Sequence, residues 1–314
     1  MLVNLVPEFF ACLTATDPPA AYHDYLDRHR QILAAYWHNY VLDLDSPHAR
    51  RVIADALRAD RSDLRRLLHA VDVVAVAEEA LARARERVEA DCAVDLYLLV
   101  GVGAANAGEL VVDGRGAAFV CLEHFTGRPN PETFGLGLAP ELLPLWIAHE
   151  VAHAVRYTSP TSRADIRRLV TDERGYYDVW EMGSRATLRE LLVNEGVAIA
   201  AARAAAPGFE PWEYLGYSRR QYRRVRELDA FLRRACAADL DASGLGLRLR
   251  YLSGGVRPSA RQVGSRTLPE RSGYYLGARL VEGYLAEHGL GQTVRATALE
   301  CRQAEERIMG AHSA

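Results

Sequence analysis

The most informative segment of the chain reads ELLPLWIAHEVAHAVRY and runs from Glu141 to Tyr157. Its apolar residues recur at the spacing of a buried helix, which cannot continue past Pro160. Within this segment, His149 and His153 are four residues apart in the motif HEVAH. Side chains four apart lie on one face of a helix, so both imidazoles can reach one ion. We therefore expect the helix to carry a metal site.

The HExxH spacing is typical of zinc-dependent hydrolases. Zinc in a catalytic site keeps three protein ligands and leaves its fourth position to water. His149 and His153 would supply two of these ligands. Glu150 lies one residue along the helix and can activate the water as a general base. The motif thus predicts Zn²⁺ as cofactor, with Glu150 in the catalytic role.

The third ligand has to come from another segment, and Glu195 is the best candidate. It lies in NEGVA, within the apolar helical pattern TLRELLVNEGVAIAAARAAA. A carboxylate in so apolar a helix needs a compensating cation, which zinc would provide. Gly196 costs about 1 kcal/mol relative to Ala inside a helix, so we expect another backbone or the metal to approach closely there.

Other interpretations of these glutamates stay open. Glu195 could pair with an arginine such as Arg189, and Glu190, Glu181 and Asp172 are rival third ligands in less apolar surroundings. A third histidine is disfavoured, because the next histidine after His153 is His288, in a separate segment.

Outward from the motif, the pattern predicts an α+β fold that is mostly helical. Residues 18–90 have helical spacing, with about three helices and an N-cap at Ser46 before Pro47. Short apolar runs at 94–101 and 117–125 predict strands of a small mixed sheet beside the HExxH helix. Further helices are expected over 185–206 and from Tyr274 onward.

The predicted organisation is a helical N-terminal part, residues 1–92, followed by a metallohydrolase domain, residues 93–314. The boundary is soft, and the two could form one compact unit. The formal net charge is −3 and all 38 basic residues are arginine, which gives no reason to expect a nucleic-acid or membrane partner. Five cysteines without a CxxC pair and the lack of a secretory signal predict a cytoplasmic protein. The oligomeric state stays open.

Three motifs together resemble a known family. The apolar-flanked HEVAH, the downstream NEGVA and the late SGYYLGARLVEGYL are similar to a bacterial family of predicted Zn-dependent proteases of the gluzincin type. The resemblance spans about residues 94–286. It implies a zincin-like fold and a peptide or protein substrate, with His149, His153 and Glu195 as ligands and Glu150 as acid and base. It also implies that the strand at 117–125 lies near the cleft, where gluzincins commonly bind substrate as an added strand.

Tyr274, in the sequence GYYLG, is a further catalytic candidate. Its hydroxyl could stabilise the oxyanion that forms when water attacks a carbonyl. Packing of the pair Tyr274 and Tyr275 in the core, or the same role for Tyr275, is the alternative. Arg279, one turn further on, is more simply a surface or structural arginine.

Two functions of other classes share these residues. Two histidines and one carboxylate also form the iron site of non-haem oxygenases, in which Glu150 would have no duty as a base. Alternatively, the chain could be a helical binding protein with a structural metal site. Metal content and tolerance of a Glu150 replacement separate the three hypotheses.

Overall fold

A computed structural model of the 314-residue chain describes all residues except 42, 104, 172–178 and 304–314. Its main sheet has the strand order β1-β2-β4-β3. β1 (Leu2–Asn4), β2 (Val94–Leu99) and β4 (Arg115–Cys121) are parallel, and β3 (Ala107–Val112) is antiparallel to β4. The strands predicted at 94–101 and 117–125 are confirmed. The second ends at Cys121, because Leu122–Phe125 form a 3₁₀ helix, η1.

Strand β3 was not predicted, and it changes the expected place of the substrate. β4 pairs with β2 on one side and with β3 on the other, so it has no free edge to which a peptide could add. The strand at 117–125 does lie near the cleft described below, which Phe119 lines, but substrate cannot add to it. Among the described strands, β3 forms that edge of the sheet. The turn between β3 and β4 carries the missed signal. Asp113 and Gly114 both have positive φ, 51° and 73°, as a two-residue Asp-Gly hairpin requires.

The N-terminal helices are shorter and more numerous than predicted. They are α1 (Val6–Leu13), α2 (Pro18–Arg28), α3 (Arg30–His38), α4 (Pro47–Arg58), α5 (Ser62–Ala70) and α6 (Val73–Arg87). Five of them occupy the described part of residues 18–90, where about three were expected. Polar caps separate them: Ser46 accepts a hydrogen bond from the Ala49 N–H, as predicted, and Asp72 accepts one from Ala75.

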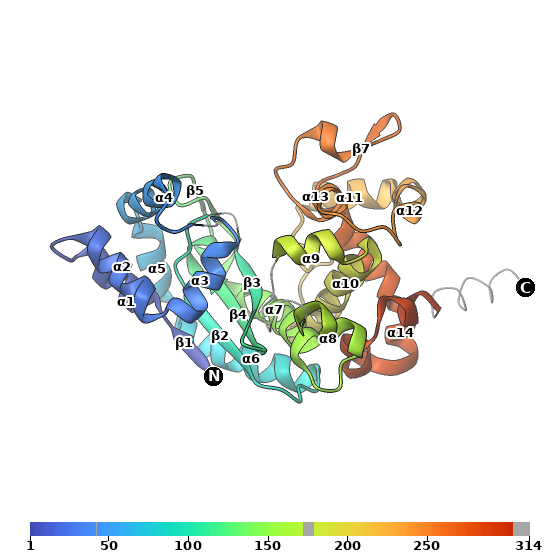
Figure 1. Cartoon of the computed structure of the whole chain (residues 1–314), viewed down its shortest axis with the longest axis horizontal. Coiled ribbons are helices and arrows are strands. Elements are labelled where there is room, and N and C mark those ends of the chain that lie inside the picture. The colour runs from blue at the N-terminus through green and yellow to red at the C-terminus, as the bar shows by residue number, and fades with distance from the viewer. Residues whose placement is uncertain (42, 104, 172–178, 304–314) are drawn as a thin grey trace, which may run out of the picture.

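The motif helix is α7 (Leu143–Thr158), preceded by the 3₁₀ turn η2 (Pro140–Leu142). It ends before Pro160, as predicted. It lies between the sheet and the C-terminal helices (Figure 1) and is buried over almost its whole length. A Cβ at Gly116 of β4 would lie 3.2 Å from Ala154 Cβ, so a glycine is needed where this helix rests on the sheet.

The C-terminal part consists mainly of helices. They are α8 (Ala164–Thr171), α9 (Val179–Arg185), α10 (Leu188–Ala205), α11 (Arg219–Glu227), α12 (Asp229–Ala237), α13 (Leu245–Leu252) and α14 (Ser272–Arg295). The helices predicted over 185–206 and from Tyr274 are confirmed. The remaining elements are β5 (Pro129–Asn130) with β6 (Gly135–Leu136), η3 (Pro258–Arg261), and β7 (Gln262–Val263) with β8 (Arg266–Thr267).

The α+β class, mostly helical with a small mixed sheet beside the motif helix, is confirmed. One cluster of buried apolar residues runs through both parts, from Leu5 to Cys301, and the division at residue 92 stays a prediction. All five cysteines are free thiols. Within the described residues, no helix is both long and apolar enough to cross a membrane.

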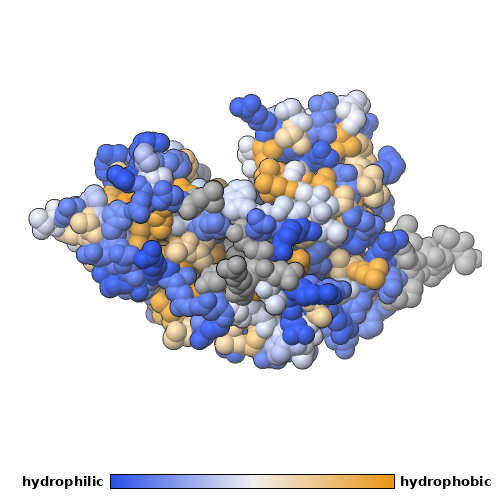
Figure 2. Space-filling model, in the orientation of Figure 1, coloured by the Kyte–Doolittle hydropathy of each residue, from blue (hydrophilic) through white to orange (hydrophobic). Residues whose placement is uncertain are grey.

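A cleft of about 380 Å³ opens between the N-terminal and C-terminal parts. The residues that line it lie on β3 and directly after α3, at Asn39 and Tyr40, and on α9, α10 and α13, with α7 between the two groups. Figure 1 shows how these elements are arranged. The surface is hollowed in the same place in Figure 2. The predicted site residues His149, Glu150, His153, Glu195 and Tyr274 all line this cleft.

Candidate metal centre

Helix α7 presents both motif histidines to the cleft floor. His149 and His153 are each 2% exposed, and their Nε2 atoms lie 3.2 Å apart. The four-residue spacing stacks them on one face, as the sequence predicted. Because the helix is packed on all sides, the rings have little freedom to turn away.

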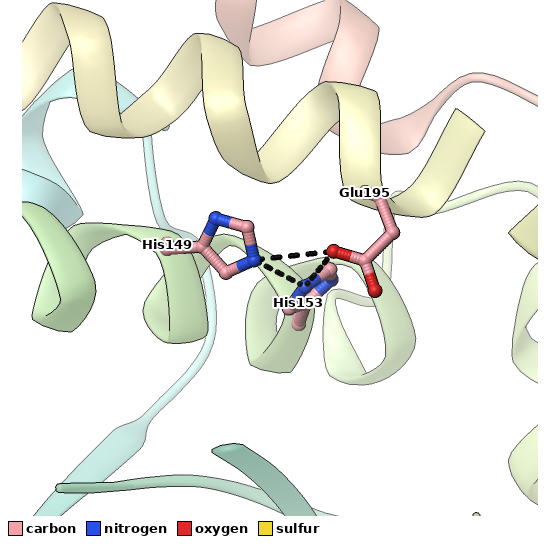
Figure 3. Close-up of side chains that lie close together, drawn as sticks. All are labelled: His149, His153 and Glu195. Atoms are coloured by element: carbon pink, nitrogen blue, oxygen red, sulfur yellow. Dashed lines mark hydrogen bonds and ion pairs between the residues drawn. The ribbon is translucent and has the colours of Figure 1, made fainter. Parts of the chain in front are cut away.

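Helix α10 brings Glu195 to the same point (Figure 3). Its Oε2 lies 3.3 Å from His149 Nε2 and 3.7 Å from His153 Nε2. The neighbouring Gly196 faces α14, where an added Cβ would overlap the carbonyl of Gly277. The expected close approach at Gly196 is thus made by the backbone of α14, and it fixes how α10 lies over the cleft.

The three ligand atoms are separated as a tetrahedral ion requires. Ligands about 2.0 to 2.1 Å from zinc at tetrahedral angles are about 3.3 to 3.4 Å from one another. The observed separations of 3.2, 3.3 and 3.7 Å are close to this value. Glu195 Oε2 is buried without a hydrogen-bond partner in the described part of the chain. His149, His153 and Glu195 therefore fit a divalent ion with imidazole and carboxylate ligands.

The charges around the cluster also favour a cation. Burial alone would raise the pKa of Glu195, but His149 and His153 lower it below its usual range. Burial opposes a charge on His153, yet Glu109, Glu195 and Glu150 together raise its pKa. The surrounding carboxylates thus hold a positive charge at this point despite its burial.

Glu150 is positioned beside the ligands and does not join them. It is 4% exposed, and its carboxylate lies within 4.8 Å of ligand atoms of His153 and Glu109. Burial raises the pKa of Glu150 well above its usual range, and Glu109 and Glu195 add to this rise. A carboxylate with a raised pKa at the edge of a metal site is suited to take up a proton.

Two of the three rival ligands lie away from the histidines. Glu190 forms an ion pair with Arg156, 2.6 Å between Oε1 and Nη2, and Glu181 is exposed on α9. Asp172 lies outside the described residues. Arg189, the predicted alternative partner of Glu195, instead forms an ion pair of 2.9 Å with another carboxylate, that of Asp241.

The two neighbouring tyrosines of α14 point to different places. Tyr274 lines the cleft, with its ring stacked on that of His149 at a centroid distance of 6.4 Å. Tyr275 donates a hydrogen bond of 3.1 Å to Asp229, away from the histidines. Arg279 forms an exposed ion pair with Glu282. Of these residues, only Tyr274 is placed to act on a ligand in the cleft.

Sequence reasoning missed three charged residues that line the cleft, Glu109, Arg248 and Arg271. The guanidinium of Arg271 lies 4.2 Å above the Tyr274 ring, and its backbone has a positive φ of 54°. Nothing local marks Arg271 in a chain so rich in arginine. Glu109 could have been found, because it is the one charged residue of the short apolar run before the Asp-Gly turn.

Comparisons with known proteins reach only part of the chain. The sequence model of the family described as "Predicted Zn-dependent protease (DUF2268)" matches residues 176–305. This range contains Glu195 and Tyr274 but begins after the HExxH motif, whereas the resemblance was expected to span about 94–286. Neither the curated proteins nor the solved structures gave a match. The C-terminal part of the chain is therefore similar to a family of predicted Zn-dependent proteases.

Proposed function

We propose that the protein is a zinc-dependent metallopeptidase. The observation that carries the proposal is the convergence of His149, His153 and Glu195 at tetrahedral separations, with Glu150 beside them in a cleft. The similarity of residues 176–305 to predicted Zn-dependent proteases supports it. A bound zinc ion would supply Lewis-acid chemistry, which activates water and polarises the scissile carbonyl.

Residues of the chain would transfer the proton and stabilise the negative charge that develops on the substrate. Glu150 accepts the proton of the attacking water on its carboxylate and passes it to the leaving amine. Tyr274 donates its hydroxyl hydrogen to the oxygen that becomes negative during the attack. Burial raises the pKa of Tyr274, so its hydroxyl stays protonated and able to donate. Arg271, stacked on the Tyr274 ring, restricts how that ring can move.

The alternative of a non-haem iron oxygenase uses the same three ligands. An oxygenase has no need for a general base, whereas here a buried carboxylate lies directly beside the ligands. The presence of Glu150 beside the ligands therefore favours a hydrolase over an oxygenase. A helical binding protein with a structural metal would equally have no use for it.

We further propose a peptide or protein chain as substrate, because β3, beside the cleft, is the outermost of the described strands of its sheet. A net charge of −3 makes nucleic acid or an anionic membrane a poor partner. Five free thiols suit a reducing compartment, so we place the protein in the cytoplasm.

Replacing Glu150 by Gln tests the proposed function. The amide keeps the shape of the side chain but cannot accept the proton, so peptide cleavage should fall by about 10² to 10⁴. Zinc content, measured by elemental analysis, should match the parent protein. If the variant cleaves a peptide library as fast as the parent, Glu150 is not the base. Stoichiometric iron with turnover of 2-oxoglutarate, in place of zinc, would contradict the hydrolase.

A further inference from the structure

Strand β3 directs one acidic side chain, Glu109, into the cleft. Its cross-strand partner on β4 is Ala118, two residues after Gly116. The Gly116 face of β4 rests on α7, since a Cβ there would lie 3.2 Å from Ala154 Cβ. Cross-strand partners share a face of the sheet, and residues two apart share it as well. Glu109 therefore points toward α7, just beneath the ligands on that helix.

Glu109 lies beside the proposed base. Ligand-type atoms of Glu109, Glu150 and His153 all lie within 4.8 Å of one another. Both carboxylates interact electrostatically with His153, the third member of this group, which is also a ligand of the proposed zinc. Two carboxylates this close repel each other, and burial of Glu150 strengthens the repulsion. The pair favours a positively charged partner.

The positive groups described near Glu109 have other partners when zinc is bound. His153 must be neutral to bind the ion, so it no longer offers Glu109 a positive charge. The metal position is defined by Glu195 and the two histidines on the side of α10. Arg271 donates a hydrogen bond of 3.1 Å to the Gly216 carbonyl and stacks on Tyr274. A cation for Glu109 would therefore come with the ligand of the cleft.

A second polar group in the cleft also lacks its partner. Asn194 is 4% exposed and lines the cleft, and its Oδ1 has no hydrogen-bond partner within the described residues. A buried acceptor without a donor costs about 1 to 3 kcal/mol, so a ligand N–H at this position would be stabilising. Hydrogen-bond donors on a bound ligand would therefore stabilise both Glu109 and Asn194.

We propose that Glu109 binds the N-terminal ammonium group of the substrate, which makes the enzyme an aminopeptidase. The inference rests on the metallopeptidase function proposed above. In an N-terminal residue the nitrogen is only about 2.5 Å from the carbonyl carbon that water attacks, from standard bond lengths and angles. Glu109 and Glu150 are correspondingly close. The side-chain nitrogen of lysine or arginine is several bonds further from the scissile carbonyl.

The reaction that follows is the addition of water across the first peptide bond. Its products are one free amino acid and a peptide shortened by one residue. The cleft of about 380 Å³ is of a size that holds a small ligand such as the end of a peptide.

Binding to an inactive protein tests the subsite without relying on turnover. The probes are the amides of the twenty amino acids and their N-acetylated forms, titrated calorimetrically into zinc-loaded Glu150→Gln protein. The best-binding amide should bind about 10- to 100-fold more tightly than its acetylated form, as expected for a charge-assisted hydrogen bond. Adding Glu109→Gln should remove this preference. Adding Glu141→Gln, at an exposed position outside the cleft, is the matched control and should retain it.

Three outcomes would overturn the proposal. The first is equal binding of free and acetylated amides, and the second is a preference that survives Glu109→Gln. The third is binding of N-acetylarginine or N-acetyllysine amide as tightly as any free amine, because Glu109 would then recognise a basic side chain. Glu109→Gln should fold as well as its parent, since it removes a like-charge repulsion.

The subsite and the function can fail separately. If the unmodified enzyme cleaves acetylated peptides at interior bonds and Glu150→Gln abolishes this cleavage, the metallopeptidase stands and the aminopeptidase is wrong. If free-amine amides bind through Glu109 and no peptide is cleaved, the subsite stands and the hydrolase is wrong.

Discussion

Two charged clusters follow one another between helices α7 and α10, and only one of them satisfies its own polar groups. In the first, Arg156 donates to Glu190 Oε1 through Nε and Nη2, at 3.2 and 2.6 Å. Its Nη1 donates to the carbonyls of Val294 and Ala296, at 2.9 and 2.8 Å. Arg156 is fully buried, and its charge and its donors are matched by the protein itself.

The second cluster, one turn away along α7, is incomplete. The Nδ1 atoms of His149 and His153 and the Oε2 of Glu195 are buried without hydrogen-bond partners in the described residues. The ligand atoms nevertheless converge on one point (Figure 3). Burial and charge are common to both clusters, so neither property distinguishes a candidate functional site from a structural ion pair. Polar groups that converge on one point and lack partners in the protein do make this distinction.

The largest effect is expected in the first cluster, the ion pair of Arg156 and Glu190. Glu190→Ala leaves Arg156 buried without its counter-charge, which should lower the free energy of unfolding by about 3 to 5 kcal/mol, as measured by urea denaturation. The folded fraction should still bind zinc, because Glu190 takes no part in the metal site. A variant as stable as the parent would show that Glu190 does not balance the charge of Arg156. A folded variant that no longer binds zinc would show that Glu190 contributes to the metal site.

A smaller effect is expected at Tyr274, which borders the incomplete cluster. Tyr274→Phe removes the proposed oxyanion donor and should lower kcat by about 10² to 10³, with KM and zinc content little changed. Tyr275→Phe is the matched control, because its hydroxyl donates to Asp229 instead. Loss of activity only in the Tyr275 variant would transfer the role by one residue. Full activity in both variants would indicate that the two tyrosines serve only in packing.

The smallest effect concerns pH. Burial and the negative charge of Glu109 raise the pKa of Glu150, whose base form the proposed mechanism requires. Activity is therefore lost as the pH falls through this pKa. Glu109→Gln should lower the pKa, and the acid limb of kcat/KM should shift toward lower pH by up to about one unit. An acid limb that stays in place or shifts upward would mean that Glu109 does not influence the base.

The local features of the site were accessible from the sequence. The four-residue spacing of His149 and His153 follows from the period of one helix, and the apolar neighbours of Glu195 mark a carboxylate in need of a cation. Both depend on residues close together in the chain. The helices that carry them were predicted for the same reason.

Features that depend on packing between distant segments were not accessible. Glu190 and Glu195 are five residues apart in one helix and so point in directions about 140° apart. Which of them meets the histidines is decided by the rotation of α10 against α7 and α14, which Gly196 and Gly277 fix by close backbone contact. The place of Glu109 likewise depends on the register between β3 and β4.

If the cluster of His149, His153 and Glu195 binds zinc, loss of its carboxylate should abolish binding, and the zinc content of Glu195→Ala measures this. Each protein is purified free of metal, given zinc, dialysed and analysed for the elements bound per chain. The unmodified chain and folded Glu190→Ala should each retain one zinc, and Glu195→Ala should retain none, because two histidines alone make a weak site. Full zinc retention by Glu195→Ala, or no zinc in the unmodified chain, would show that this cluster is not a zinc site.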